Sequence, residues 1–213
     1  MIITKTPFRM SFFGGGTDIE DYFKENGGAV LSTTFDKYCY VNVRHLPRFF
    51  DYSSELTYSK MERVKDTDDI KHPAIREAMK FLDMQEIRLT YEADLPARSG
   101  LGTSSSFAVG MLNAFYALKG KYADKKKLAD EAIYLERVLC NEAGGWQDQI
   151  AASFGGFNRI NFNTDGTYDV LPVIISPERK QHLNNNLMMF FTGFTRFSSE
   201  VQKANNVSGS EEV

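Results

Sequence analysis

The order of strand-like and helix-like segments along this chain predicts an α+β fold. Segments with strand patterns cluster in residues 2–91 and return in residues 157–192, and helix-patterned segments fill the centre between them. A doubly wound parallel sheet would instead need strands and helices that alternate throughout. Hydrophobic residues make up 42% of the 213 residues, which supports a packed core.

In the amino-terminal half we expect five strands and two helices. Apolar and β-branched residues that alternate with polar ones favour strands, whereas an initial proline and apolar residues at helical spacing favour a helix over residues 73–82. The strands are expected at residues 2–13, 29–35, 38–45 and 87–91 and, with a surface loop, within the charge-rich residues 50–71, and a short helix is expected at 19–24.

The second half begins with helices and ends with strands. Long apolar-patterned runs predict helices at residues 104–118 and 125–141, and a shorter run predicts one at 147–153. Residues 157–162, 168–174 and 187–192 read as strands. Trp146 and the phenylalanines at 154 and 157 are expected in the core, because aromatic side chains are more often core than ligand contacts.

Charge and cysteine content exclude several function classes. The 25 basic and 28 acidic residues give a net charge of −3 and are interspersed, so we expect neither nucleic acid nor a membrane as a partner. The most basic run, residues 119–127, is better explained as a solvated helix junction than as a docking patch. Cys39 and Cys140 are scattered, which argues against a zinc site or disulfide framework and fits the reducing cytoplasm.

The most informative segment is the glycine- and hydroxyl-rich stretch at residues 95–106, which precedes an apolar helix. Gly100 and Gly102 let the backbone approach a ligand, and the Ser/Thr cluster can cap the helix and offer hydroxyls. The N–H groups at the helix N-terminus favour an anion, and Arg98 could reach the same phosphates. The alternative is a plain capped loop entering a buried helix.

This segment lacks the Gly-Lys-Ser/Thr ending of a Walker A loop and resembles a motif of the GHMP small-molecule kinases instead. That family includes galactokinase, homoserine kinase and mevalonate kinase, and its motif reads Pro-x-x-x-Gly-Leu-Gly-Ser-Ser-Ala. The residues in register, which the resemblance assigns to ATP phosphate binding together with Arg98, are Pro96, Gly100, Leu101, Gly102, Thr103, Ser104 and Ser105. Thr103 and Ser105 are conservative departures from the motif.

A second block, residues 6–18, runs from an apolar strand into three glycines and an acid. It resembles the amino-terminal signature of the sugar-kinase branch, and its Gly-Gly-Gly-Thr-Asp form is similar to the D-glycero-D-manno-heptose 7-phosphate kinases and their fucokinase-like relatives. The resemblance implies that Arg9 stabilises charge at the reaction centre. It also implies sugar contacts from Gly14, Gly15, Gly16, Thr17 and Asp18. Alternatively, Arg9 pairs with an acid at a strand end, and Asp18 caps the following helix.

A third block at residues 142–149 resembles the glycine-rich turn and acid of the same heptose-kinase subgroup. The resemblance makes Asp148 the catalytic base. It makes Glu136 a magnesium ligand with the Ser104 hydroxyl, although Glu136 lies one residue further from Asp148 than in some relatives. The structural alternatives are that Asp148 merely begins a helix and that Glu136 is a solvent-facing helix residue.

The three blocks together imply an ATP- and Mg²⁺-dependent phosphotransferase. We expect phosphorylation of a sugar hydroxyl, the anomeric one of D-glycero-D-manno-heptose 7-phosphate, for nucleotide-activated heptose synthesis. The alternatives are a fucokinase- or galactokinase-like enzyme and a nucleotide- and sugar-binding module without turnover. Expected partners are ATP and a small sugar phosphate, and a homodimer is left open.

The resemblance also implies a domain organisation. Residues 1–197 are expected to form the two-layer sheet-and-helix amino-terminal domain of the GHMP kinases, with its ribosomal-protein-like topology. The polar residues 198–213 are expected to be a linker or the start of a second domain. We therefore expect the family's carboxy-terminal domain to be absent from this chain.

Overall fold

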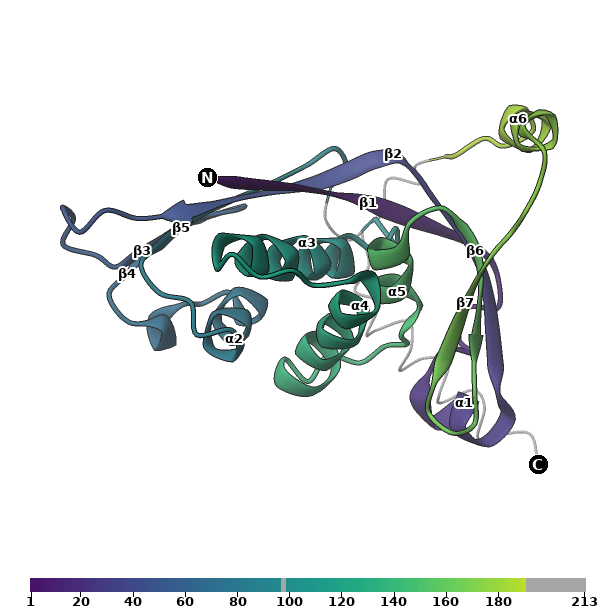
Figure 1. Ribbon diagram of the computed structural model, residues 1–213, viewed down its shortest axis with the longest axis horizontal. Coiled ribbons are helices and arrows are strands. Elements are labelled where there is room, and N and C mark those ends of the chain that lie inside the picture. Colours follow the sequence, from purple (N-terminus) through teal and green to yellow (C-terminus); the bar gives the residue numbers. More distant parts are fainter. Residues whose placement is uncertain (97–98, 191–213) are drawn as a thin grey trace.

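The protein folds into a sheet with helices packed against one of its faces. The computed structural model describes residues 1–96 and 99–190, so that residues 198–213 lie outside the described part. Figure 1 shows the strands as one twisted layer and helices α2, α3, α4 and α5 as a second layer beneath it. The α+β, two-layer fold that the sequence predicts is therefore confirmed.

The elements follow the predicted order closely. The first half contains β1 (Ile2–Phe13), α1 (Glu20–Asn26), β2 (Gly28–His45), β3 (Ser54–Thr57), β4 (Met61–Val64), the 3₁₀-helix η1 (Thr67–Asp69), α2 (Pro73–Phe81) and β5 (Ile87–Ala93). The second half contains α3 (Thr103–Leu118), α4 (Lys125–Ile133), the π-helix η2 (Tyr134–Leu139), α5 (Gln147–Phe154), β6 (Phe157–Phe162), β7 (Tyr168–Pro172) and α6 (Pro177–Asn185).

Strand β2 organises the seven-stranded sheet. It was expected as two strands, but it is one strand of 18 residues that pairs antiparallel with β1 along its length. Its first half pairs with β6 and its second half with β5, and β3, β4 and β7 extend the sheet outward. Asp36 and Lys37 are the two residues between the expected strands 29–35 and 38–45. They lie instead in a register shift of the β1–β2 ladder, which bulges without ending.

Three further segments differ from the sequence prediction. Residues 50–71 contain two strands, since β3 and β4 pair as an antiparallel hairpin. Helix α6 was not predicted, although the Ser176 side chain caps it and Pro177 occupies its first turn. The strand expected at 187–192 is not formed at residues 187–190, and residues 191–192 lie outside the described part.

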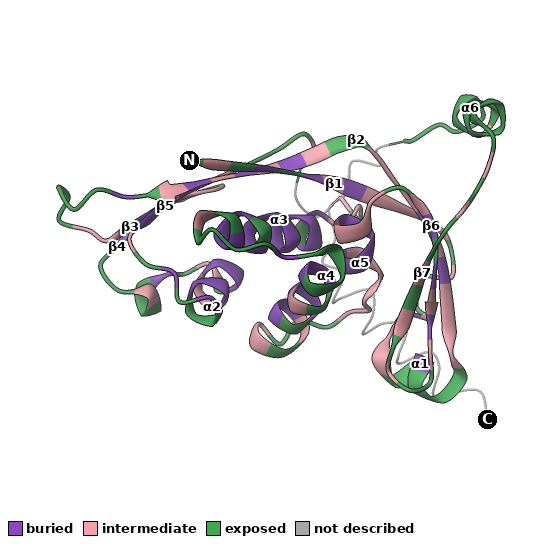
Figure 2. Ribbon diagram, viewed as in Figure 1, coloured by how far each residue is buried: buried purple, intermediate pink, exposed green. Residues whose placement is uncertain are grey.

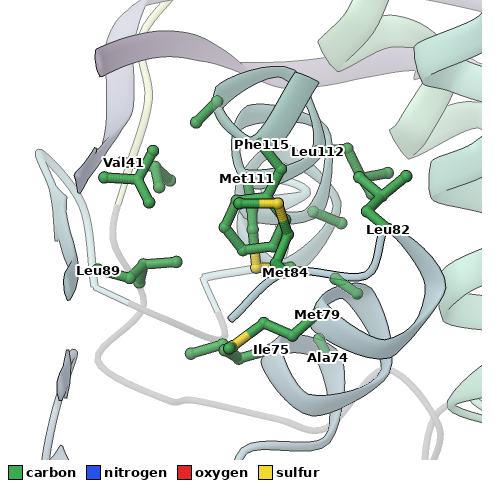
Figure 3. Close-up of a cluster of buried hydrophobic side chains, with 14 of the residues drawn as sticks. Val41, Ala74, Ile75, Met79, Leu82, Met84, Leu89, Met111, Leu112 and Phe115 are labelled. Carbon is green, nitrogen blue, oxygen red and sulfur yellow. The ribbon is translucent and has the colours of Figure 1, made fainter. Parts of the chain in front are cut away.

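The core lies between the sheet and the helices, where buried residues line the facing sides of both layers (Figure 2). The larger cluster joins β2 and β5 to α2 and α3, with Met111, Leu112 and Phe115 of α3 facing Ile75 and Met79 of α2 (Figure 3). A smaller cluster joins α1, β6 and α5. Trp146, which was expected in the core, is half-buried and packs against the margin of this cluster, edge-on to Phe23.

Helix α3 occupies the centre of the helical layer. It packs against β1 and β2, and most of its residues are buried. The Thr4 hydroxyl donates to the Gly110 carbonyl at 2.9 Å, and a Cβ on Gly110 would lie 2.7 Å from the Thr6 hydroxyl. This close approach holds the middle of α3 against β1. No helix in the described ranges is long and apolar enough to cross a membrane.

Truncation of Phe115 to alanine tests this core. The side chain is fully buried in the larger cluster, so Phe115→Ala should lower the free energy of unfolding by about 3–5 kcal/mol. Tyr122 is 87% exposed, and Tyr122→Ala should change stability by less than about 0.5 kcal/mol. Urea unfolding of both variants measures the difference. Equal stability of the two variants would contradict the packing described here.

Candidate active site

The glycine-rich loop at residues 99–102 leads directly into α3. Gly100 and Gly102 both have positive φ angles, 76° and 71°, which glycine adopts at no steric cost. Gly102 is the N-cap of α3, and within the described residues no side chain caps this helix. The prediction that the Ser/Thr cluster caps α3 is therefore wrong. The first N–H groups of α3 stay available to an anion.

The three serine hydroxyls at the start of α3 form hydrogen bonds with other segments of the protein. Ser104 is exposed at the start of α3, and its hydroxyl donates to Glu136 Oε1 at 2.7 Å. Ser105 is buried and donates to Glu136 Oε2, also at 2.7 Å, whereas Ser106 donates to the Pro7 carbonyl of β1. Of the other motif residues, Thr103 is buried, Leu101 half-buried and Pro96 exposed, and Arg98 lies outside the described residues.

Glu136 is a buried carboxylate at the centre of this arrangement. The residue is 1% exposed, so a solvent-facing position on a charged helix is ruled out. Besides the two serines, the Gln149 side-chain amide of α5 donates to it. Within the described residues no cationic side chain pairs with Glu136, and hydroxyl and amide donors alone hold its charge.

A π-helical turn places Glu136. In η2 the N–H of Cys140 donates to the Leu135 carbonyl five residues earlier, where an α-helix would use a four-residue step. A π-turn accommodates one extra residue in a helix without displacing the residues on either side. Glu136 lies within this turn, and its side chain faces Ser104.

Arg9 of β1 and Asp148 of α5 form the second part of the site. Arg9 Nε lies 2.7 Å from Asp148 Oδ1, and the side chains are only 14% and 24% exposed. Arg9 also donates through Nη1 to the Gly100 carbonyl at 2.9 Å, and its backbone N–H donates to the Leu101 carbonyl. The ion pair thus lies against the glycine-rich loop.

The triple-glycine turn, residues 14–18, lies between β1 and α1. A Cβ on Gly14 would lie 1.9 Å from the Ala29 carbonyl oxygen, so this glycine serves close packing against β2. Around Gly16 nothing lies within 4 Å, and around Gly15 only a Gln147 amide nitrogen does, at 3.7 Å. The side chain of Thr17 bonds the backbone of Gly14 and Ala29. Open space is therefore confined to Gly15 and Gly16.

Asp18 is 2% exposed, and its carboxylate accepts hydrogen bonds from the N–H of Gly16 and from the backbone and side chain of Gln147. It does not cap the helix that follows it: the N-cap of α1 is Ile19, without a side-chain bond. Sequence reasoning had considered a sugar contact or this cap, and did not consider α5 as the partner.

Two polar side chains near the site were not singled out from the sequence. Arg137 of η2 donates to the carbonyls of Glu142, Ala143 and Gly145, and it thereby holds the turn that leads to α5. Gln149 holds Glu136, as described above. Only the glycine pair Gly144-Gly145 signalled a tight turn here, and nothing local to the sequence indicated which cation would bind its carbonyls.

The electrostatics favour a cation beside Glu136. Partial desolvation and the charge of Glu136 raise the pKa of Glu142, against the weaker opposing effect of Arg137. Burial, then the charges of Glu142 and Glu136, raise the pKa of the Cys140 thiol to about 12. Ser104 and Glu136 offer the hard oxygen ligands that Mg²⁺ prefers. The described residues contain no cluster of three or more metal-ligating side chains, so water or ligand oxygens would complete its coordination.

Neutralising Glu142 tests the field around Glu136. When folding raises the pKa of a carboxyl group, the folded protein loses stability as the pH rises through that pKa. The ionised Glu142 therefore opposes folding at neutral pH. Glu142→Gln should therefore raise the urea midpoint at pH 7. This gain should shrink towards zero below the ordinary glutamate pKa of 4.5. The exposed Glu25→Gln serves as control, and a gain that persists unchanged in acid would contradict the assignment.

Comparison with known proteins finds a family whose domain matches the part of the chain that contains the glycine-rich loop, Glu136 and Asp148. Residues 70–156 match the GHMP kinases N terminal domain. The chain is 30% identical over 212 residues to the D-glycero-alpha-D-manno-heptose 7-phosphate kinase of Campylobacter jejuni, covering 95% of this chain and 62% of that protein. It is 26% identical to the L-fucokinase/L-fucose-1-P guanylyltransferase of Bacteroides fragilis, over 90% of this chain and 24% of that one.

A solved structure of a similar protein has the same fold. The crystal structure of a D-glycero-D-manno-heptose 1-phosphate kinase from Bacteroides thetaiotaomicron superimposes with a TM-score of 0.74 at 25% identity, covering 83% of this chain and 61% of that one. The chain thus spans about three fifths of the length of the heptose kinases it matches. The sequence match, the shared fold and the three motif blocks make this chain similar to the GHMP kinases, whose N-terminal domain matches residues 70–156.

Proposed function

We propose that this chain forms the ATP- and sugar-binding part of a sugar kinase that phosphorylates the anomeric hydroxyl of a heptose 7-phosphate. One observation carries the proposal: the Arg9–Asp148 pair lies beside the N-terminus of α3. A Cβ on Gly102, the N-cap, would lie 3.5 Å from Asp148 Oδ2. A candidate base therefore faces the place where the helix N-terminus would hold a phosphoryl group.

The first requirement of phosphoryl transfer is to neutralise and position the phosphates. The uncapped N–H groups of α3 and the left-handed glycines of the loop provide donors and room for them. Arg9 adds a fixed positive charge, because its guanidinium is held by Asp148 and by the Gly100 carbonyl. These groups are held in place by the protein's own hydrogen bonds, and donors that are fixed in this way contribute most to the stabilisation of developing charge.

The second requirement is a place for the proton of the attacking hydroxyl. Asp148 Oδ1 is taken by Arg9, which leaves Oδ2, on the side of the glycine-rich loop, to accept that proton or to orient the hydroxyl. Arg9 keeps the carboxylate oriented and balances its charge. Asp148 can therefore pair with Arg9 through one oxygen and still receive the acceptor hydroxyl at the other.

We assign Ser104 and Glu136 as the protein ligands of Mg²⁺. A bound magnesium ion would neutralise charge on the phosphate oxygens. Ser104 Oγ and Glu136 Oε1 lie 2.7 Å apart, and Glu136 has no cationic partner in the described part of the chain. Both observations support a cation at this position. Gln149 and Ser105 orient the carboxylate from behind.

The sugar class rests on the relatives and on the triple-glycine turn. Two of the similar proteins are named as heptose phosphate kinases and one as a fucokinase. The open space around Gly15 and Gly16 suits a bulky acceptor next to Asp148. Because ATP is the phosphoryl donor and both cysteines are free, we propose the cytoplasm as the place of this activity.

A panel of acceptors tests the proposal. ADP release should be fastest with a heptose 7-phosphate and slower with the unphosphorylated heptose and with galactose. Preference for L-fucose would instead support the fucokinase alternative. Calorimetry of the same sugars and of a non-hydrolysable ATP analogue follows binding independently of turnover. Binding of both ligands without ADP release from any acceptor would favour a binding module.

Asp148→Asn tests the assigned base. The variant keeps the shape of the side chain but cannot accept the proton, so kcat should fall by about 10²–10⁴ while binding of the ATP analogue stays nearly unchanged. Asp165→Asn, in an exposed turn, is the control with the same change of charge. Steady-state kinetics with calorimetry measures both effects, and near-normal turnover would remove Asp148 from the mechanism.

Ser104→Ala tests the metal assignment. Loss of the hydroxyl should raise the Mg²⁺ concentration needed for half-maximal activity, because one of two protein ligands is gone. Ser105→Ala is a matched comparison, since Ser105 donates to the other oxygen of Glu136 but is buried away from the solvent side. It should shift the Mg²⁺ titration less. If Ser104→Ala and the wild-type chain needed the same Mg²⁺ concentration for half-maximal activity, another group would bind the metal.

A further inference from the structure

The side chain of Asp18 is bonded to a segment far along the chain. Its Oδ1 accepts from the Gly16 N–H at 3.0 Å and from the Gln147 amide Nε2 at 3.1 Å, and its Oδ2 accepts from the Gln147 backbone N–H at 3.1 Å. The Asp18 backbone carbonyl accepts from the Trp146 N–H, also at 3.1 Å. Apart from Gly16, all these partners belong to the start of α5.

Helix α5 has no cap of its own. Its N-cap residue is Trp146, which makes no side-chain bond to the helix, and the backbone N–H of Gln147 is one of the donors that every helix leaves unpaired at this end. A carboxylate suits this position, because it accepts the orphan hydrogen bond and its charge interacts favourably with the helix dipole. Asp18 thus caps the N-terminus of α5 from a distant part of the chain, whereas most helices are capped by a Ser or Asp directly before their first turn.

Two neighbours are shaped around this bond. A Cβ on Gly145 would lie 1.9 Å from Asp18 Oδ2 and 2.3 Å from its Cγ, so only glycine leaves room for the carboxylate. Gln147 extends the network, because its Oε1 accepts from the Ser11 hydroxyl of β1 at 2.5 Å while its Nε2 donates to Asp18. The start of α5 is therefore bound to β1 and to the triple-glycine turn together.

Asp148 is the next residue after Gln147, and its distance to Arg9 depends on where α5 begins. We infer that Asp18 is a positioning residue: it caps α5 from outside and so fixes Asp148 against Arg9 and the acceptor. This replaces the direct sugar contact expected from the motif. The kinetic part of the inference rests on the proposed kinase function, whereas the capping part does not.

Hydrogen exchange tests the capping directly. Asp18→Ala should speed exchange of the Gln147 amide by about tenfold or more, because its hydrogen bond to a charged acceptor is lost, and should change the Trp146 amide less, because its acceptor is the Asp18 backbone carbonyl. Asp21→Ala, an exposed acid on α1, removes the same charge and should leave these amides unchanged. Unchanged exchange at α5 in Asp18→Ala would overturn the inference, whether or not the protein proves to be a kinase.

Kinetics separates positioning from sugar binding. If Asp18 acts through α5, Asp18→Ala should lower kcat by about 10–100-fold, with the KM values for sugar and ATP changed less than about threefold. A rise of tenfold or more in the sugar KM with an unchanged kcat would show a direct contact and would overturn the inference. Should no variant and no acceptor give turnover, the proposed function fails, and the exchange result alone decides the capping.

Gly145→Ala is a second test of the same inference, in which Asp18 itself is unchanged. The added methyl group should displace the carboxylate, reproducing both the faster exchange at α5 and the lower kcat. In the Asp18→Ala background the same methyl group has space, so the double variant should be little worse than Asp18→Ala alone. Full additivity of the two substitutions would contradict the inference, because it would mean that Gly145 and Asp18 act on different parts of the site.

Discussion

The site depends on the burial of one negative charge, that of Glu136. Burying a carboxylate is costly unless donors surround it, and here they come from Ser104 and Ser105 at the start of α3 and from Gln149 in α5. The carboxylate therefore adds polar bonds between three segments, α3, η2 and α5, that also share the larger apolar cluster through Leu135 and Ala152. The helix start that would receive phosphate and the helix that carries Asp148 are both positioned by the same charge.

Sequence reasoning predicted the parts of the candidate site that belong to short motifs. The loop glycines, Ser104 and Asp148 each lie beside distinctive neighbours, and the chemistry of a helix N-terminus follows from local structure alone. The role of Asp18 could not be predicted in this way, because its partners in α5 lie 129 residues further along the chain. Its local context indicated a cap, which was the correct chemistry applied to a different helix.

The fold was predictable to a similar extent, and the error at residues 187–190 has a tertiary cause. Alternating patterns gave β1 and β6 with their observed bounds, because one face of each strand is buried. The apolar residues 187–190 read as a strand and are not one: Leu187 is 41% exposed, and Met188, Met189 and Phe190 are more exposed still. An apolar run becomes a strand only beside a hydrogen-bonding neighbour, and the presence of that neighbour is a tertiary property.

The double pairing of β2 has a consequence for synthesis on the ribosome. Its second half can pair with β5 soon after it emerges, but the partner of its first half, β6, is made only after α5. Until then one edge of residues 28–33 stays open, and such an edge invites pairing with other chains. Completion of the sheet, and with it the smaller core cluster around Phe23 and Ile160, therefore follows translation of all the residues of the candidate site. A nascent chain that stalls before β6 would be a natural substrate for chaperones.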